Sequence, residues 1–205
     1  MKILELFCGT KSFSNIAETR GHKVMTVDNN PVFNPVLLCD INTFKFNGEK
    51  FDIVWASPPC ECFSVATLGR NWNKDDTPKN DKTRSALKLL CRTVDIIKEI
   101  NPEFYFIENP RCKTRKMQVM QQFHRKTVTY CQYGDTRMKP TDIWTNAVDW
   151  KPKDPCKNGD KCHVAAPRGS RTGTQGLKDA KERGRIPGKL CLEIIEYCER
   201  TQKGI

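Results

Sequence analysis

The sequence predicts a doubly wound α/β fold with a largely parallel sheet, and two observations support this expectation. Short apolar runs typical of buried strands alternate with segments that have the period of amphipathic helices. Polar, glycine or thiol residues follow the predicted strands directly, in "FCG", "VDNN", "CDIN", "SPPC" and "IENP". Because ligands of such folds bind at the carboxyl ends of the strands, we expect these five segments to share one edge of the sheet.

The first half of the chain contains four predicted strands and one short helix. The strands are predicted at residues 2–8, 23–28, 36–40 and 51–56, where apolar residues gather. The helix is predicted over residues 12–21 and ends at Gly21. The polar residues 65–80 then form a loop.

The second half starts with the clearest helix, over residues 81–100, where apolar residues recur three or four places apart until Asn101 and Pro102 end it. We predict further strands at residues 103–109, 126–131 and 142–146, and a helix at residues 115–123. Residues 150–176 are rich in Pro, Gly, Cys and Lys and predict an irregular insertion. An amphipathic helix beginning at Pro187 closes the chain, so residues 1–205 are expected to form one domain.

Composition narrows the class of protein. Lys and Arg number 35 against 24 Asp and Glu, and this net charge of +11 favours a polyanionic partner, most simply nucleic acid, although a merely basic surface would have the same charge. No apolar run approaches the length of a membrane span, and "MKILELFCG" lacks the order of a signal peptide. Eleven cysteines, an odd number spread through predicted elements, favour a reducing, cytoplasmic location over a disulfide framework.

Three predicted strand ends carry groups that suit a nucleotide or nucleoside ligand. Gly9 lies in the turn between the first strand and helix, and Asp28 and Asp40 end the second and third strands. An acidic group at such a position can bind ribose hydroxyls. Taken alone, Gly9 is better explained by a structural turn, and the alternative for Asp28 is a strand-end or helix-cap role. The three strand ends together are more informative than any one of them.

Cys60 follows two prolines directly after a predicted buried strand. A cysteine nucleophile must be exposed, fixed in position and partly ionised, and a stiff loop at a strand end supplies the first two conditions. Cys62 is expected to be packing or incidental, because the Cys-x-Cys spacing is tighter than that of paired zinc ligands. Glu108 and Asn109 end the fifth strand beside Cys60, where a carboxyl group can act as a general acid, although a surface glutamate before a turn is an equal alternative.

These motifs, in this order, resemble the cytosine-C5 DNA methyltransferase family. The matching segments are "ELFCG", "VDNN", "CDIN", "SPPCECFS", "IENP", "QYGDTRMKPTDIWT" and "RIPGKLCLEI", which run almost from end to end of the chain. The resemblance implies a Rossmann-like S-adenosylmethionine-dependent methyltransferase fold, DNA as the substrate and S-adenosylmethionine as the cofactor.

The resemblance also implies a role for individual residues. Cys60 matches the nucleophile that adds to C6 of a flipped cytosine, and Glu108 matches the glutamate that supports N3. The implied catalytic set is Cys60, Glu108, Asn109, Arg137 and Lys139, and the implied cofactor-binding set is Phe7, Gly9, Asp28, Asn29, Asp40, Ile41 and Pro58. Within the second set, Phe7 stacks near the adenine, Asp28 holds the ribose and Asp40 holds the adenine amino group. Arg70 and Lys74 are candidates for phosphate contacts.

The sequence departs from the family pattern in ways that keep other functions open. The turn "CGTKSFS" has fewer glycines, Pro110 follows "EN" where the family has valine, and about 25–40 residues stand where the family has a large target-recognition region. The alternatives are an RNA cytosine-C5 methyltransferase and a catalytically silent nucleic-acid-binding relative. Arg183 and Arg185 would also suit a more acidic cofactor. The minimal size indicates a monomer from a bacterium, phage or mobile element.

Cys156, Cys162 and His163 lie in the short irregular segment. They would bind zinc if a fourth ligand joined them, and Cys112 is the candidate for that ligand. The spacing is off the common patterns, so the sequence favours a loop without a metal. The basic, glycine-rich segments at residues 166–176 and 181–189 would contact phosphates, the carboxylate end of the cofactor, or solvent alone.

Overall fold

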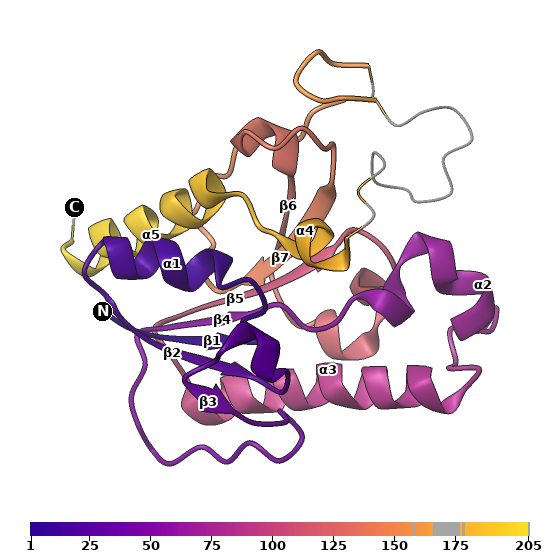
Figure 1. Ribbon diagram of the computed structural model, residues 1–205, viewed down its shortest axis with the longest axis horizontal. Coiled ribbons are helices and arrows are strands. Elements are labelled where there is room, and N and C mark those ends of the chain that lie inside the picture. Colours follow the sequence, from indigo (N-terminus) through magenta and orange to yellow (C-terminus); the bar gives the residue numbers. More distant parts are fainter. Residues whose placement is uncertain (158, 166–176, 178, 205) are drawn as a thin grey trace.

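A computed structural model describes residues 1–157, 159–165, 177 and 179–204 (Figure 1). Its centre is a seven-stranded sheet with the order β3-β2-β1-β4-β5-β7-β6. The strands are β1 (Lys2–Leu6), β2 (Lys23–Asp28), β3 (Leu37–Leu38), β4 (Ile53–Ala56), β5 (Phe104–Pro110), β6 (Arg125–Thr129) and β7 (Pro140–Thr145). All pairs from β3 to β5 are parallel, and β7 is antiparallel to both its neighbours. The predicted doubly wound, largely parallel sheet is confirmed.

Helices cover both faces of this sheet. The helices are α1 (Ser12–Thr19), α2 (Leu68–Asn71), α3 (Asp81–Ile100), α4 (Ala180–Gly184) and α5 (Gly188–Gln202). Figure 1 shows α1 and α5 on one face, α3 on the other, and α2 and α4 toward the end where the parallel strands finish. Burial on both faces explains why the central strands are continuous apolar runs rather than alternating ones.

Each face has its own hydrophobic core. On the α1 and α5 side, the Trp55 ring stacks on Phe13 at 4.5 Å between ring centroids and on Phe106 at 6.2 Å. On the α3 side, Leu90 and Val94 pack with the β1 and β4 side chains that point that way. Truncating one such fully buried aromatic side chain to alanine typically costs about 3–5 kcal/mol of stability, so these two cores hold the helices against the strands.

Helix α3 has the bounds that its sequence predicts. The Asn80 side chain accepts a 2.9 Å hydrogen bond from the Thr83 backbone N–H at its start. Asn101 takes a left-handed conformation with φ of 47° at its end and donates its backbone N–H to Ile97. Across the residues that the structure describes, neither this helix nor any other combines the length and the hydropathy needed to cross a membrane.

The predicted helix at residues 115–123 is wrong. The structure has two short 3₁₀ helices there, η4 (Lys113–Lys116) and η5 (Gln118–Met120), with an extended Met117 between them. This break lets Arg115 reach Asp142 of β7 while Met117 and Met120 both enter the α3-side core. Tertiary contacts of the segment therefore outweigh its helical pattern.

Two other segments differ from expectation in extent. The strand predicted at residues 36–40 is only two residues long, because a turn closed by Asp40 follows it, in which the Asp40 carbonyl accepts from Thr43 and Phe44. The polar loop at residues 65–80 contains a 3₁₀ turn, helix α2 and an isolated bridge between Trp72 and Pro78. The described part of residues 150–176 contains no helix or strand, as predicted, and the segment 166–176 lies outside the described residues.

Candidate active site

The carboxyl ends of β1, β2, β4 and β5 bring the predicted motifs to one edge of the sheet. Strand β4 pairs with β5 in parallel register, with Ala56 opposite Ile107. The residue after Ile107 is Glu108, and the chain beyond Ala56 leads through the two prolines to Cys60. The predicted neighbourhood of the thiol loop and the carboxyl-bearing strand is therefore present in the fold.

The turn after β1 is held by Asp28. Phe7 and Gly9 both have left-handed backbone conformations, with φ of 58° and 45°. The Asp28 carboxylate accepts from the Gly9 backbone N–H at 3.0 Å and from the Asn30 backbone N–H at 2.9 Å. Asp28 is thus fixed by two backbone donors, and each of its oxygens retains a lone pair for a further hydroxyl donor.

The other predicted cofactor residues differ in what they can offer. Phe7 is half-buried and packs at the margin of the α3-side core, whereas Asn29 and Asp40 are exposed. One Asp40 carboxylate oxygen accepts from the Asn42 backbone N–H at 2.8 Å, which orients the carboxyl group. Ile41 is buried in the core, so only its backbone is available to a ligand.

Asn109 ties the Cys60 loop to β5. Its side-chain amide donates a 2.8 Å hydrogen bond to the carbonyl of Pro58, and its amide oxygen accepts from the Thr114 hydroxyl at 2.7 Å. Asn109 and Pro58 are both buried. These contacts tie the Pro58 carbonyl, two residues before Cys60, to β5.

Burial raises the pKa of the Cys60 thiol, and the negative charge of Glu108 raises it further, while Lys139 acts in the opposite direction. These influences oppose the partial ionisation that the sequence analysis required of a cysteine nucleophile. Cys60 is half-buried in this structure, whereas the sequence analysis required an exposed thiol.

Cys62 is placed away from this chemistry. Its side chain is buried in the α3-side core, and its backbone carbonyl accepts a 2.7 Å hydrogen bond from the indole N–H of Trp72. This packing agrees with the structural role that the sequence suggested.

Glu108 has a partner that the sequence did not reveal. The Tyr130 hydroxyl donates a 2.8 Å hydrogen bond to Glu108 Oε1, and both residues are buried. Complete burial, followed in importance by the charge of Glu108, raises the pKa of Tyr130 well above its usual value, so the phenol remains a donor. Lys139 Nζ lies 4.7 Å from the centroid of the Tyr130 ring. The sequence signal that could have identified Tyr130 is its position as the aromatic residue next to the end of the predicted strand at 126–131.

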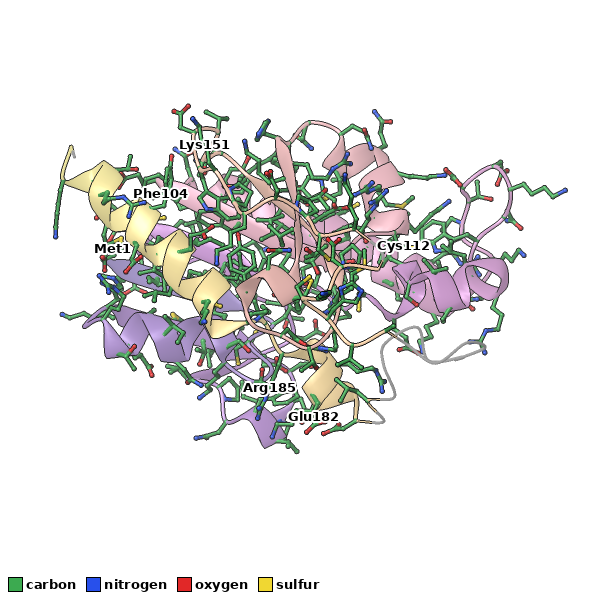
Figure 2. All side chains as sticks on the ribbon, turned by 90° about the horizontal axis from the view of Figure 1, so that it is seen from above. Met1, Phe104, Cys112, Lys151, Glu182 and Arg185 are labelled. Atoms are coloured by element: carbon green, nitrogen blue, oxygen red, sulfur yellow. The ribbon has the colours of Figure 1, made fainter. Side chains whose placement is uncertain are left out.

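Arg137 and Lys139 do not have equal roles. Arg137 is buried, and its guanidinium binds the Asp135 carboxylate and the backbone carbonyl of Arg183, the latter at 3.1 Å. It also donates toward the carbonyls of Glu182 and Arg185, which lie together at one edge in Figure 2. Arg137 thus fixes the segment that leads to α5. Lys139 is half-buried, donates a 3.2 Å hydrogen bond to the same Arg183 carbonyl, and lowers the pKa of Cys60 through its charge.

Another buried carboxyl group, Glu5, was not identified as functional from the sequence. It lies on β1 and accepts hydrogen bonds from the backbone N–H and hydroxyl of Ser14 in α1. Burial raises the pKa of Glu5 to about 7, against the smaller opposing effect of the Ser14 hydrogen bonds. Glu5 therefore joins β1 to α1 directly behind the turn that Asp28 holds.

A basic hollow lies beside the Cys60 loop. A cavity of about 660 Å³ is lined by Leu68, Gly69, Trp72, Asn73, Lys74, Asp76, Lys79, Cys112, Lys113 and Lys116. Lys74 and Lys116 are exposed, as is Arg70 on α2, while Lys113 is buried against Asp76 and the Trp72 ring. These exposed cations lie on segments that follow the Cys60 loop and β5 directly, where a polyanion would meet them.

Comparison with known sequences finds a matching family model and a relative that covers almost the whole chain. The sequence model of the family of C-5 cytosine-specific DNA methylases matches residues 1–126. A protein of Frog virus 3 (isolate Goorha), described as a probable DNA (cytosine-5)-methyltransferase, is 30% identical over 97% of this chain and 100% of its own length. This relative belongs to a frog virus and not to a phage, which gives no support to the bacterial or phage source expected from the chain's size.

Solved structures share the fold at low identity. A DNA modification methyltransferase from an E. coli prophage has a TM-score of 0.51 at 16% identity, covering 75% of this chain and 49% of that chain. The Dnmt2 methyltransferase of S. pombe has a TM-score of 0.50 at 14% identity, covering 75% and 51%. The chain thus spans about half the length of these two proteins, and the likeness supports the methyltransferase fold alone.

Proposed function

The chain belongs to the C-5 cytosine-specific DNA methylase family, and we propose that it transfers a methyl group from S-adenosylmethionine to C5 of cytosine in DNA. The observation that carries the proposal is the meeting of Cys60, at the end of β4, with Glu108 on the neighbouring β5, close enough for the carboxylate charge to raise the pKa of the thiol.

The residues at the β1 and β2 ends fit S-adenosylmethionine. The Asp28 carboxylate is fixed by two backbone donors and suits ribose hydroxyls, and Phe7 offers a half-buried aromatic surface to an adenine. Asp40, at the end of β3, suits the adenine amino group. When bound, the cofactor supplies an electrophilic methyl group.

The chain's own residues then activate the base. Cytosine C5 is a poor nucleophile, so addition of the Cys60 sulfur to C6 is needed to convert the ring to an enamine. As the C6–S bond forms, the thiol proton of Cys60 is released, and a proton shared between Glu108 and N3 neutralises the negative charge that develops on the ring; Tyr130 orients Glu108 for this. After C5 has gained the methyl group, the C5 proton passes to water, and cleavage of the C6–S bond restores the aromatic ring and releases Cys60 as the thiolate.

Access to C6 requires that the base leave the duplex. C6 is hidden in stacked DNA, so the target cytosine must be flipped into the site. Helix α2 and the basic hollow adjoin the Cys60 loop, and we assign phosphate contacts to Arg70 and Lys74 there. We further propose that the protein acts in a reducing compartment, which the eleven free cysteines support, and that it acts as a monomer.

Mass spectrometry of nucleosides tests the proposed function. The purified protein is incubated with S-adenosylmethionine carrying a deuterated methyl group and with matched DNA and RNA of the same sequence. The expected product is 5-methyl-deoxycytidine with the deuterium label, reduced about 10²–10⁴-fold in rate by Glu108→Gln. Label in cytidine of RNA alone would transfer the activity to RNA, and cofactor binding without any labelled nucleoside would indicate a silent relative.

A further inference from the structure

Four side chains of types that bind metals converge next to Tyr130, and the mechanism uses none of the four. The Sγ atoms of Cys131, Cys156 and Cys162 and one ring nitrogen of His163 all lie within 4.8 Å of one another. Cys131 belongs to η6 (Tyr130–Tyr133), and the other three belong to the irregular segment after Trp150. We propose that these four side chains bind one structural Zn²⁺ ion.

The distances between the ligand atoms fit a tetrahedron. Bonds of about 2.3 Å to sulfur and about 2.0–2.1 Å to nitrogen place two sulfurs about 3.8 Å apart, and a sulfur and a nitrogen about 3.6 Å apart. Here His163 Nδ1 lies 3.7 Å from Cys156 Sγ and 3.6 Å from Cys162 Sγ. Cys162 Sγ lies 3.6 Å from Cys131 Sγ, and the Cys131–Cys156 separation of 3.0 Å must lengthen on binding.

The fourth ligand is the feature that the sequence did not supply. Cys131 occupies this position, and Cys112, the candidate from the sequence, is outside the cluster. The spacing between ligands 131 and 156 spans β7, which explains why no short zinc motif is visible in the sequence.

The surroundings are built to hold the cluster. The Cys156 backbone N–H donates a 2.9 Å hydrogen bond to the Thr129 hydroxyl, which fixes the segment at the end of β6. The Val164 backbone N–H donates to the carbonyl of Thr136 at 2.8 Å, on the other side of the ligands. The Gln132 side-chain amide points at Cys162 Sγ at 3.7 Å, as an outer donor to a thiolate does.

Charge and composition agree with a metal. Zn²⁺ with three thiolates and a neutral imidazole carries one net negative charge, and the exposed Lys153, Lys157 and Lys161 lie on the same segment. Binding releases the three thiol protons. Because all four positions are filled by protein atoms, such a site is structural and has no position open for catalysis.

The zinc ion would stabilise the irregular segment after Trp150, which is too short to form a hydrophobic core of its own. In its described residues, the stretch from Lys151 to Ala165 has no helix or strand and is attached through few backbone hydrogen bonds. Zinc would attach it to the residue that follows Tyr130, and so to the element that supplies the Glu108 partner. The inferred role is to hold this short insertion against the catalytic domain.

Metal content of the purified full-length chain tests the proposal independently of activity. After dialysis against EDTA, we expect one zinc per chain by plasma mass spectrometry, and none in Cys162→Ala or His163→Ala, which change accessible ligands. Cys112→Ala is the matched control and should retain one zinc. Replacement by Co²⁺ should produce the thiolate-to-cobalt absorption of a tetrahedral site in the native chain and the control only.

Three outcomes would overturn the inference. The first is a native chain that binds neither zinc nor cobalt in reducing buffer, and the second is binding that Cys162→Ala and His163→Ala leave unchanged. The third is a Cys131–Cys156 disulfide in the unreduced chain, seen as the loss of two hydrogens in the intact mass, with no metal bound after reduction. A chain that binds zinc but does not methylate DNA would support this site while refuting the proposed function.

Discussion

The hydroxyl of Tyr130 lies 2.8 Å from Oε1 of Glu108, and both side chains are buried between β5 and the end of β6. Tyr130→Phe keeps the ring and removes only this donor. A hydrogen bond to a charged group contributes about 1.5–3 kcal/mol, so methylation should slow roughly 10- to 100-fold. Cofactor binding, measured by calorimetry, should not change.

The control for this substitution is Tyr105→Phe. Tyr105 lies on β5, the strand that carries Glu108, and packs edge-on against Phe123, with 5.5 Å between ring centroids. Its loss of a hydroxyl should leave the methylation rate within about twofold. Equal rates for Tyr130→Phe and the native protein would remove Tyr130 from the mechanism.

Asn109 is predicted to act through the position of Cys60. Asn109→Asp retains an acceptor for Thr114 but replaces the donor to the Pro58 carbonyl by an oxygen. An unpaired buried polar group costs about 1–3 kcal/mol, so the unfolding midpoint should fall and methylation should slow more than 10-fold. The same change at the exposed Asn15 is the control. Normal activity of Asn109→Asp would show that this contact does not position the loop.

The raised pKa of Glu5 predicts that the free energy of unfolding depends on pH. Its pKa is about 7 in the folded protein against 4.5 as the ordinary value, so the folded state holds a proton that the unfolded state has lost between these pH values. Stability is therefore highest below pH 4.5 as far as this group is concerned, falls as the pH rises toward 7, and is then constant. The full effect is roughly 3 kcal/mol.

Glu5→Gln should remove this contribution, because the amide oxygen still accepts from Ser14 and carries no charge to bury. Urea unfolding at several pH values measures the effect. The native and Glu5→Gln proteins should differ little near pH 5, and the variant should be the more stable at pH 8. A constant difference across that range would refute the prediction.

DNA affinity should depend steeply on salt. Each phosphate contact contributes about −0.9 to the slope of log affinity against log salt, so replacing Arg70 and Lys74 by alanine should make the slope shallower by about 1–2. Lys23→Ala, at the exposed amino end of β2, removes a charge at the other end of the sheet and should leave the slope unchanged. Equal slopes for all variants would place the DNA elsewhere.

Much of the site follows from the sequence because strand ends are local features. The apolar run before Ser57, the paired prolines and the strand before Pro110 each fix a residue at the carboxyl edge without reference to distant parts of the chain. The burial of Asp28 by the turn at Gly9 also follows from adjacent β1 and β2.

The features that sequence reasoning missed depend on contacts between distant segments. Tyr130 reaches Glu108 only because β7 turns back between β5 and β6, and Cys131 joins Cys156 through the same arrangement. The wrong helix at residues 115–123 has the same cause, since the Arg115 contact with Asp142 depends on β7. The ionisation of Cys60 likewise depends on burial that its local sequence does not specify.

The central claim is that Cys60 forms a covalent bond to the base, and trapping with DNA that contains 5-fluorocytosine tests it most directly. Fluorine at C5 blocks the final elimination, so a covalent complex should accumulate with S-adenosylmethionine, and peptide mapping should find the adduct on Cys60. Cys60→Ser should form no covalent complex and lose methylation while folding normally. Cys62→Ser, which changes a buried core thiol, should still form the complex and methylate DNA. An adduct on Cys62, or an active enzyme that forms no adduct, would contradict the account.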